Sequence, residues 1–135
     1  MTAPGDLMQA LFMRLKTDRS LSQLLGGTGL LEHASDKAAF PHVTYGRTSA
    51  FNLESGADND NDQQVTFHVW SKTQGDAETR LIMDSLRKRL DGAAFSIGSR
   101  DRTLLSLEFA EARYDEDLAV HHGLLRFRAL TEEST

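Results

Sequence analysis

The sequence predicts an α+β fold: a two-layer sandwich in which a mainly antiparallel β-sheet packs against one long helix and an N-terminal helix. Several segments alternate apolar and polar residues with the period of a strand, and others repeat apolar residues at helical spacing. Few helices separate the strand segments, and parallel strands need such crossovers, so antiparallel pairing is favoured. The 135 residues suit a single domain spanning 1–135.

Apolar spacing and capping residues predict three helices. The first covers Asp6 to Lys16, where capping spacing precedes a leucine-rich stripe. A short second helix begins near Ser20 and ends before Gly26. The longest runs from Asp76 to Asp91, preceded by the capping spacing of Thr73 with Asp76 and followed by Gly92.

Period-two alternation predicts the strands. Val65, Phe67 and Val69 form one apolar face of a half-buried strand. Further along, Leu105, Leu107 and Phe109 share the apolar face of another strand, which a polar turn over 114–117 connects to the last one. The expected strands are 29–33, 43–46, 65–70, 95–97, 105–110 and 124–129, with the last two forming a long hairpin.

The segment between the two central strands is acidic and almost free of apolar residues. The composition of residues 53–64 therefore predicts a flexible acidic loop. A segment with so few apolar side chains can bury too little apolar surface to offset the entropy lost on ordering. The run Asp58 to Asp62 resembles the start of a calcium loop, but Gln63 stands where the glycine belongs and Val69 where the bidentate carboxylate belongs. We expect no metal there, and we expect disordered ends over 1–5 and 133–135.

Charge and composition narrow the function classes. The formal net charge is −5, which disfavours binding to a phosphate backbone. A nucleic-acid module is the weakest alternative, and it would need a continuous basic face around clusters such as Arg87 to Arg89. The chain has no cysteine, so disulfides, thiolate metal sites and cysteine nucleophiles are excluded. We also expect no signal peptide and no membrane span.

Five histidines raise the possibility of a metal or acid–base site: His33, His42, His68, His121 and His122. No two of them have the i, i+4 spacing of a helical ligand pair, and His121 and His122 point to opposite faces if they lie in a strand. His68 can meet one of this pair across neighbouring strands. The alternative function is therefore a small-ligand-binding or enzymatic domain with His68, His121 or His122 in a pocket between sheet and helix.

Two arginines and a tryptophan stand on the polar faces of predicted strands. Arg126 and Arg128 share a face with Leu124, so this face is either open to water or paired with acidic groups of another subunit. Trp70 lies opposite the apolar face of its strand and is a candidate anchor for a contact.

The order and spacing of several segments resemble the tail completion (tail terminator, head–tail joining) proteins of long-tailed phages, prophages and gene transfer agents. The matching segments are Leu24-Leu25-Gly26-Gly27, Phe40-Pro41-His42-Val43-Thr44-Tyr45-Gly46, His68-Val69-Trp70-Ser71 and Leu124-Leu125-Arg126-Phe127-Arg128-Ala129. The resemblance implies a structural virion assembly protein that forms a ring, typically a hexamer, capping the tail tube and joining it to the head. It implies no catalytic residue and no cofactor.

The resemblance also implies partners and location. The partners are further copies of the chain, the tail tube protein and the head–tail connector protein, with DNA only in passage through the lumen. The location is the host cytoplasm during assembly and the virion tail afterwards. We expect Glu54, Asp58, Asp60, Asp62, Trp70, Arg126 and Arg128 to face a neighbouring copy or the lumen, where acidic side chains repel DNA phosphates. If neutralising the four acidic residues abolished assembly, the acidic segment would be an interface element instead.

Overall fold

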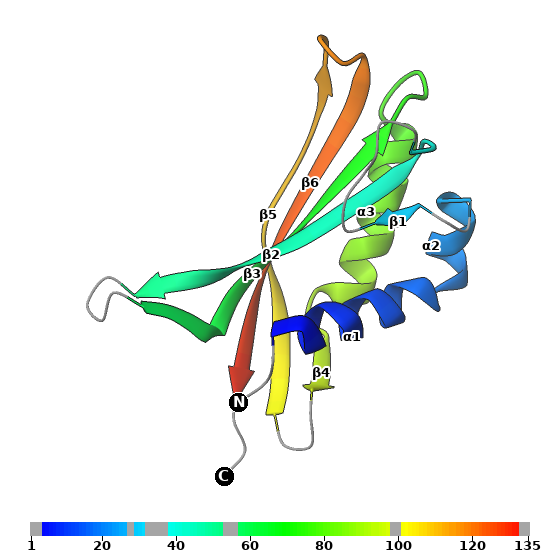
Figure 1. Ribbon diagram of the computed structural model, residues 1–135. Coiled ribbons are helices and arrows are strands. Elements are labelled where there is room, and N and C mark those ends of the chain that lie inside the picture. Colours follow the sequence, from blue (N-terminus) through cyan, green and yellow to red (C-terminus); the bar gives the residue numbers. More distant parts are fainter. Residues whose placement is uncertain (1–3, 27–28, 32–37, 53–56, 98–100, 133–135) are drawn as a thin grey trace.

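A computed structural model describes residues 4–26, 29–31, 38–52, 57–97 and 101–132. Within these ranges three helices and six strands follow one another along the chain (Figure 1). They are α1 (Pro4–Lys16), α2 (Arg19–Leu24), β1 (Leu30–Leu31), β2 (His42–Asn52), β3 (Ala57–Ser71), α3 (Ala77–Leu90), β4 (Ala94–Ile97), β5 (Asp101–Asp115) and β6 (Val120–Glu132).

The six strands form one sheet in the order β1-β2-β3-β6-β5-β4. Only the short pair of β1 with β2 is parallel, and every other neighbouring pair of described strands is antiparallel. The expected α+β class with a mainly antiparallel sheet is therefore confirmed. The helices lie together on one side of the sheet, while the far ends of β2 and β3 reach away from them (Figure 1, left).

The core lies between the helices and the sheet. Val65, Phe67 and Val69 are fully buried, as their alternation predicts. Leucines of α1 and apolar residues of α3 complete the core, and the Phe67 and Phe127 rings meet edge to face at 5.8 Å. The expected long helix is only slightly longer than the N-terminal one, with 14 residues in α3 and 13 in α1.

The second and third helices begin a few residues away from the positions expected for them. The N-cap of α2 is Asp18, not Ser20, and its carboxylate accepts a hydrogen bond from the Leu21 amide at 2.9 Å. Asp18 also pairs with Arg89, so it links α2 to α3. The N-cap of α3 is Asp76, and Thr73 instead bonds to the Ser71 hydroxyl.

The predicted acidic loop is largely strand. Residues 53–56 lie outside the described part of the chain, but 57–64 belong to β3, in which 57–59 and 63–64 pair with β2 and 62–64 pair with β6. Backbone pairing with neighbouring strands gives this segment strand geometry without apolar side chains. The hairpin turn likewise comes later than predicted, over residues 116–119, because β5 continues to Asp115. The predicted disordered ends at 1–3 and 133–135 lie outside the described residues, while Pro4 already belongs to α1.

A β-bulge corrects one predicted face. The register between β5 and β6 shifts between Leu107 and Phe109, and one extra residue reverses the side to which later side chains point. Phe109 therefore leaves the apolar face it was expected to share with Leu107, and it is exposed. Ala110 pairs with the buried Leu125 in its place.

Candidate functional site: the helix-free face of the sheet

The sheet has a second face, opposite the helices, which we call the helix-free face. Its residues alternate along β3 and β6 with the buried core residues and face away from α3. Gly123 marks the helix side, since its backbone approaches Met83 of α3. The helix-free face comprises Thr44, Gln64, Thr66, His68, Trp70, Phe109, Glu111, Arg113, His122, Leu124, Arg126 and Arg128.

Trp70, His68 and His122 form a stacked cluster at one end of this face. The Trp70 and His122 rings are 4.1 Å apart and nearly parallel, at 6°. The His68 Nδ1 atom lies 2.8 Å from the His122 Nε2 atom, within hydrogen-bond distance. The Trp70 indole N–H donates to the Thr44 hydroxyl at 3.2 Å. The predicted meeting of His68 with one of the neighbouring histidines is thus confirmed, but it occurs on the side away from the helices.

Burial favours the neutral form of these imidazoles. Desolvation lowers the pKa of His68, and for His122 desolvation and then the neighbouring His68 lower the pKa. A hydrogen bond between two ring nitrogens needs one N–H and one lone pair, so two protonated rings cannot form it. Burial also lowers the pKa of His42, although its hydrogen bond to the Ala39 carbonyl opposes this shift.

The two arginines of β6 have partners within their own chain. Arg128 makes a bidentate pair with Asp62, with N–O distances of 2.7 and 3.0 Å, and this pair lowers the pKa of Asp62. The Arg126 guanidinium lies over the Phe109 ring, 5.4 Å from its centroid. The sequence analysis left two alternatives for this face, exposure to water or pairing with acidic groups of another subunit. Arg128 is instead paired with an acidic group of its own subunit, Asp62.

The remaining residues that the sequence analysis singled out do not belong to the helix-free face as defined above. Asp58 lies opposite Phe51 in the β2–β3 pairing, and Asp60 lies in the same part of β3, close to the register shift after Ser49. Glu54 and His33 lie outside the described residues. His121 points away from His122 and packs against Tyr114, with ring centroids 4.8 Å apart.

Sequence reasoning missed the contacts of two residues on the helix-free face. Phe109, the partner of Arg126, was assigned to the core because the bulge that turns it outward leaves no mark in an alternating pattern. Thr44 was assigned to a strand, but its hydrogen bond to Trp70 depends on β2 and β3 being neighbours. The order of strands in the sheet was needed for both.

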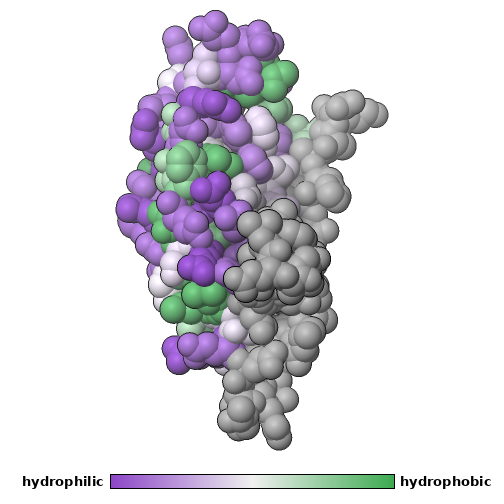
Figure 2. Space-filling view, turned by 90° about the vertical axis from the view of Figure 1, so that its left-hand side faces the viewer, coloured by the Kyte–Doolittle hydropathy of each residue, from purple (hydrophilic) through white to green (hydrophobic). Residues whose placement is uncertain are grey.

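The helix-free face is chemically mixed. Figure 2 shows small hydrophobic groups separated by hydrophilic residues on the coloured part of this side of the molecule. No cluster of three or more metal-ligating side chains occurs among the described residues. None of the helices in the described ranges is both long and apolar enough to cross a membrane.

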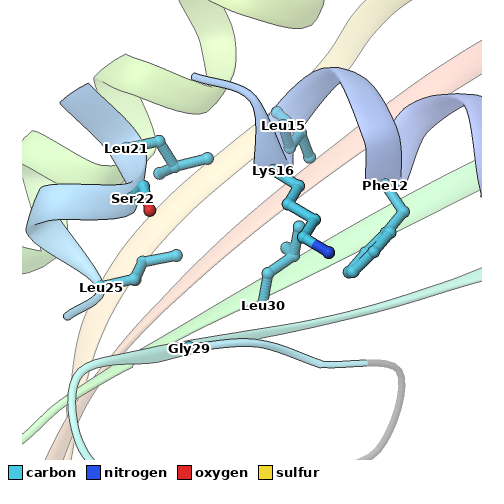
Figure 3. A pocket seen from close by; sticks show the side chains of 8 residues that line it. All are labelled: Phe12, Leu15, Lys16, Leu21, Ser22, Leu25, Gly29 and Leu30. Atoms are coloured by element: carbon cyan, nitrogen blue, oxygen red, sulfur yellow. The ribbon is translucent and has the colours of Figure 1, made fainter. Parts of the chain in front are cut away.

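A pocket of about 230 Å³ lies elsewhere, between α1, α2 and β1 (Figure 3). Phe12, Leu15, Leu25 and Leu30 point into it, with Lys16 at its edge. Its lining contains no histidine. The histidine-lined pocket between sheet and helix that the alternative function requires is therefore not formed by this cavity or by the His68–His122 pair.

Among the described residues, parts of two strands have no strand on their outer side. The described pairs of β1 are with Val43 and Thr44 of β2, and no described strand lies along the outer side of β2 from 46 to 52. β4 pairs with residues 101–104 of β5. The segment after α3 then covers β5 as far as Leu107, whose amide donates to the Asp91 carboxylate at 3.0 Å. From 108 to 115 no described strand covers the outer edge of β5.

Comparisons with known proteins agree with this architecture. A family model described as tail completion protein gp17 matches residues 9–132. A chain from the virion of a native gene transfer agent particle has a TM-score of 0.71 and 23% identity, covering 90% of this chain and 91% of that one. The gp17 protein of bacteriophage SPP1 has a TM-score of 0.65 and 21% identity, covering 98% of this chain and 93% of that one. The comparison with curated proteins gives no match.

Proposed function

Because the chain belongs to the tail completion protein gp17 family, we propose that it is a structural subunit that caps the finished tail tube as a ring and joins the tail to the head. The match over residues 9–132 carries this proposal, since it spans nearly the whole described fold. The ring in the particle is a hexamer. Its partners are the tail tube protein and the head–tail connector protein, first in the host cytoplasm and then in the virion tail.

The surface supports a role in assembly without catalysis. In the described residues the helices lie on one side of the sheet, which leaves the helix-free face for contacts with other chains. A ring needs heterologous contacts, in which one patch meets a different patch on the next copy. Trp70, Arg126 and Arg128 are the contact residues we propose on the helix-free face, together with Phe109.

Acidic residues are proposed to line the path of the DNA. Asp62 contributes little net charge, because Arg128 neutralises it within the subunit. The repulsion of phosphates then falls to Glu54, Asp58 and Asp60. Neutralising these three residues should leave ring formation intact and slow DNA passage. Loss of the ring itself would make this segment an interface element.

The proposal is tested on tail tubes assembled from the tail tube protein of the same particle. Electron microscopy of tubes mixed with the protein should show a ring at one end and an arrest of tube growth. Arg126→Glu should reduce capping by reversing a charge on the helix-free face, whereas Lys88→Glu, the same reversal on exposed α3, should cap normally. Tubes that grow unchanged and carry no protein at their ends would overturn the proposal.

A further inference from the structure

The hairpin of β5 and β6 ends in a tip that carries an exposed leucine beside acidic residues. We define the hairpin tip as residues 115–119, and it lies beyond the helices at the top of Figure 1. Leu118 is 61% exposed, the largest fraction among the exposed large apolar side chains of the described residues. It follows Asp115, Glu116 and Asp117 in the sequence. None of these three carboxylates forms an ion pair with another described residue.

The turn holds Leu118 in place. The Leu118 amide donates a hydrogen bond to the Asp115 carboxylate at 3.0 Å, so the side chain of Asp115 closes the turn. Val120, directly after the turn, is buried and anchors the start of β6. A side chain presented by an ordered turn loses less conformational entropy on binding than one on a mobile segment.

The pocket between α1, α2 and β1 suits such a side chain (Figure 3). Phe12, Ser22 and Leu30 of its lining are partly exposed, so the pocket reaches the surface. Its volume is about 230 Å³. An apolar cavity of about 150 Å³ accommodates a benzene molecule, so the four carbon atoms of a leucine side chain fit into this pocket.

The edge of the pocket is basic. Lys16 lines the pocket, and its ammonium lies 5.6 Å from the centroid of the Phe12 ring. Arg19 lines an adjoining hollow that also includes Lys16. Neither lining contains an acidic residue, and neither of these two cations forms an ion pair with a described residue. Asp18, the acid beside Arg19 in sequence, is buried and paired with Arg89.

We propose that Leu118 of one copy inserts into this pocket of the next copy, where the acidic residues of the hairpin tip face the basic edge of the pocket. The partner is a second copy because one chain carries both complementary surfaces, and their opposite charges favour the contact. An apolar group that enters a pocket elsewhere on an identical molecule makes a heterologous contact, which forms a ring when the rotation closes. This inference rests on the proposed ring and identifies a contact that builds it.

Leu118 suits the pocket better than the other large apolar side chains that are at least half exposed, Met13, Leu81 and Tyr114. Met13 belongs to α1, the helix that carries the basic edge of the pocket. Leu81 lies in the middle of α3, where the helix surface surrounds it. The Tyr114 ring already packs against His121, with centroids 4.8 Å apart. Of the four, only Leu118 lies in a turn.

A photoreactive leucine analogue at position 118 tests the contact. Its diazirine group forms a carbene on irradiation and inserts into C–H bonds of whatever surrounds it. The protein is bound to tail tubes, irradiated, and run on a denaturing gel. We expect a dimer of twice 15.0 kDa, with the link mapped by mass spectrometry to residues 12–30 of the second copy. A link to the tail tube protein, a link to another part of the second copy, or no link at all would overturn the proposal.

Substitutions separate the packing from the charges, with the protein concentration that caps half of the tubes as the readout. Leu118→Ala should raise this concentration at least about tenfold, whereas Leu118→Met, of similar volume, should leave it nearly unchanged. Glu116→Lys should raise it about fivefold, and adding Lys16→Glu to the same chain should restore most of the loss. Lys88→Glu, a charge reversal on exposed α3, is the matched control and should have no effect.

The outcomes distinguish this inference from the function on which it rests. Rings that form equally well with Leu118→Ala would overturn the insertion and leave the capping function standing. Additive losses from Glu116→Lys and Lys16→Glu, without rescue, would overturn the pairing of the hairpin tip with the edge of the pocket. If the native protein neither caps tubes nor associates with itself, the proposed function fails and this contact fails with it.

Discussion

Gly123 allows α3 to pack closely against the sheet. The change in the free energy of unfolding caused by Gly123→Ala shows how much stability depends on this close packing. A Cβ atom at this position would lie 2.5 Å from the Met83 Sδ atom and 3.0 Å from both Met83 Cγ and Thr79 Cγ2. Nonbonded carbon atoms prefer about 3.5–4.0 Å, so the neighbours must move by about 0.5–1 Å. Met83 can change rotamer, but Thr79 is fully buried and β-branched, and it has little freedom.

The expected loss follows from two opposing contributions. Overpacking a close contact destabilises by about 1–3 kcal/mol. Replacing glycine with alanine also restricts the unfolded chain, which stabilises by about 0.4–1 kcal/mol. Gly123→Ala should therefore lower the free energy of unfolding by about 1–2 kcal/mol, a fall in Tm of about 4–8 °C for a domain of this size. Urea unfolding followed by circular dichroism gives the value directly.

Gly46 is the matched control in the same sheet. It lies in β2 with an ordinary φ, and an added Cβ meets no atom within 4 Å. Gly46→Ala should be neutral or stabilise by up to about 1 kcal/mol. In a Met83→Ala background, Gly123→Ala should cost about 1 kcal/mol less than in the native chain, because only the Thr79 contact remains. Equal effects of Gly123→Ala and Gly46→Ala would refute the close approach of α3.

Two further predictions concern buried ionisable groups. The native pKa values of His42, His68 and His122 are lowered, so the unfolded chain binds protons first as the pH falls below about 6.5. The free energy of unfolding should then decrease from pH 7 toward pH 5, less steeply in His68→Gln, and a flat profile in urea titrations would contradict the neutral cluster. Asp18→Ala should destabilise by about 1–3 kcal/mol, since it removes both the cap of α2 and the pair with Arg89. Asp18→Asn keeps the cap and should lose clearly less in the same urea assay, whereas an equal loss would show that the cap contributes nothing.

Local patterns were enough for the elements whose side chains alternate or repeat strongly. Val65, Phe67 and Val69 are buried because a strand places every second side chain on one face. The end of α3 is also readable, since Gly92 adopts a φ of 79° directly after Asp91. In these places, propensity and tertiary packing favour the same structure.

The remaining features depend on contacts far apart in the sequence. Residues 57–64 belong to a strand that pairs with β2 and, from Asp62 on, with β6, which composition alone does not reveal. Phe109 turns outward because of a bulge whose position depends on the β6 register. The His68–His122 pair and the Asp62–Arg128 pair both join β3 to β6. Local sequence patterns do not give the order of strands in the sheet, so they do not show that these two strands are neighbours. The candidate surface was therefore predicted in part, including a contact of His68 with one of the two neighbouring histidines, whereas the Asp62–Arg128 pair was not predicted.

The central claim is that the protein acts by assembling with copies of itself at the end of a tail tube. Counting copies per tube end measures it most directly, by cryo-electron microscopy of tubes incubated with the native chain. We expect one closed ring of six subunits at a single end of each tube. Single copies scattered along the tube wall, or bare ends in the presence of excess protein, would contradict this account.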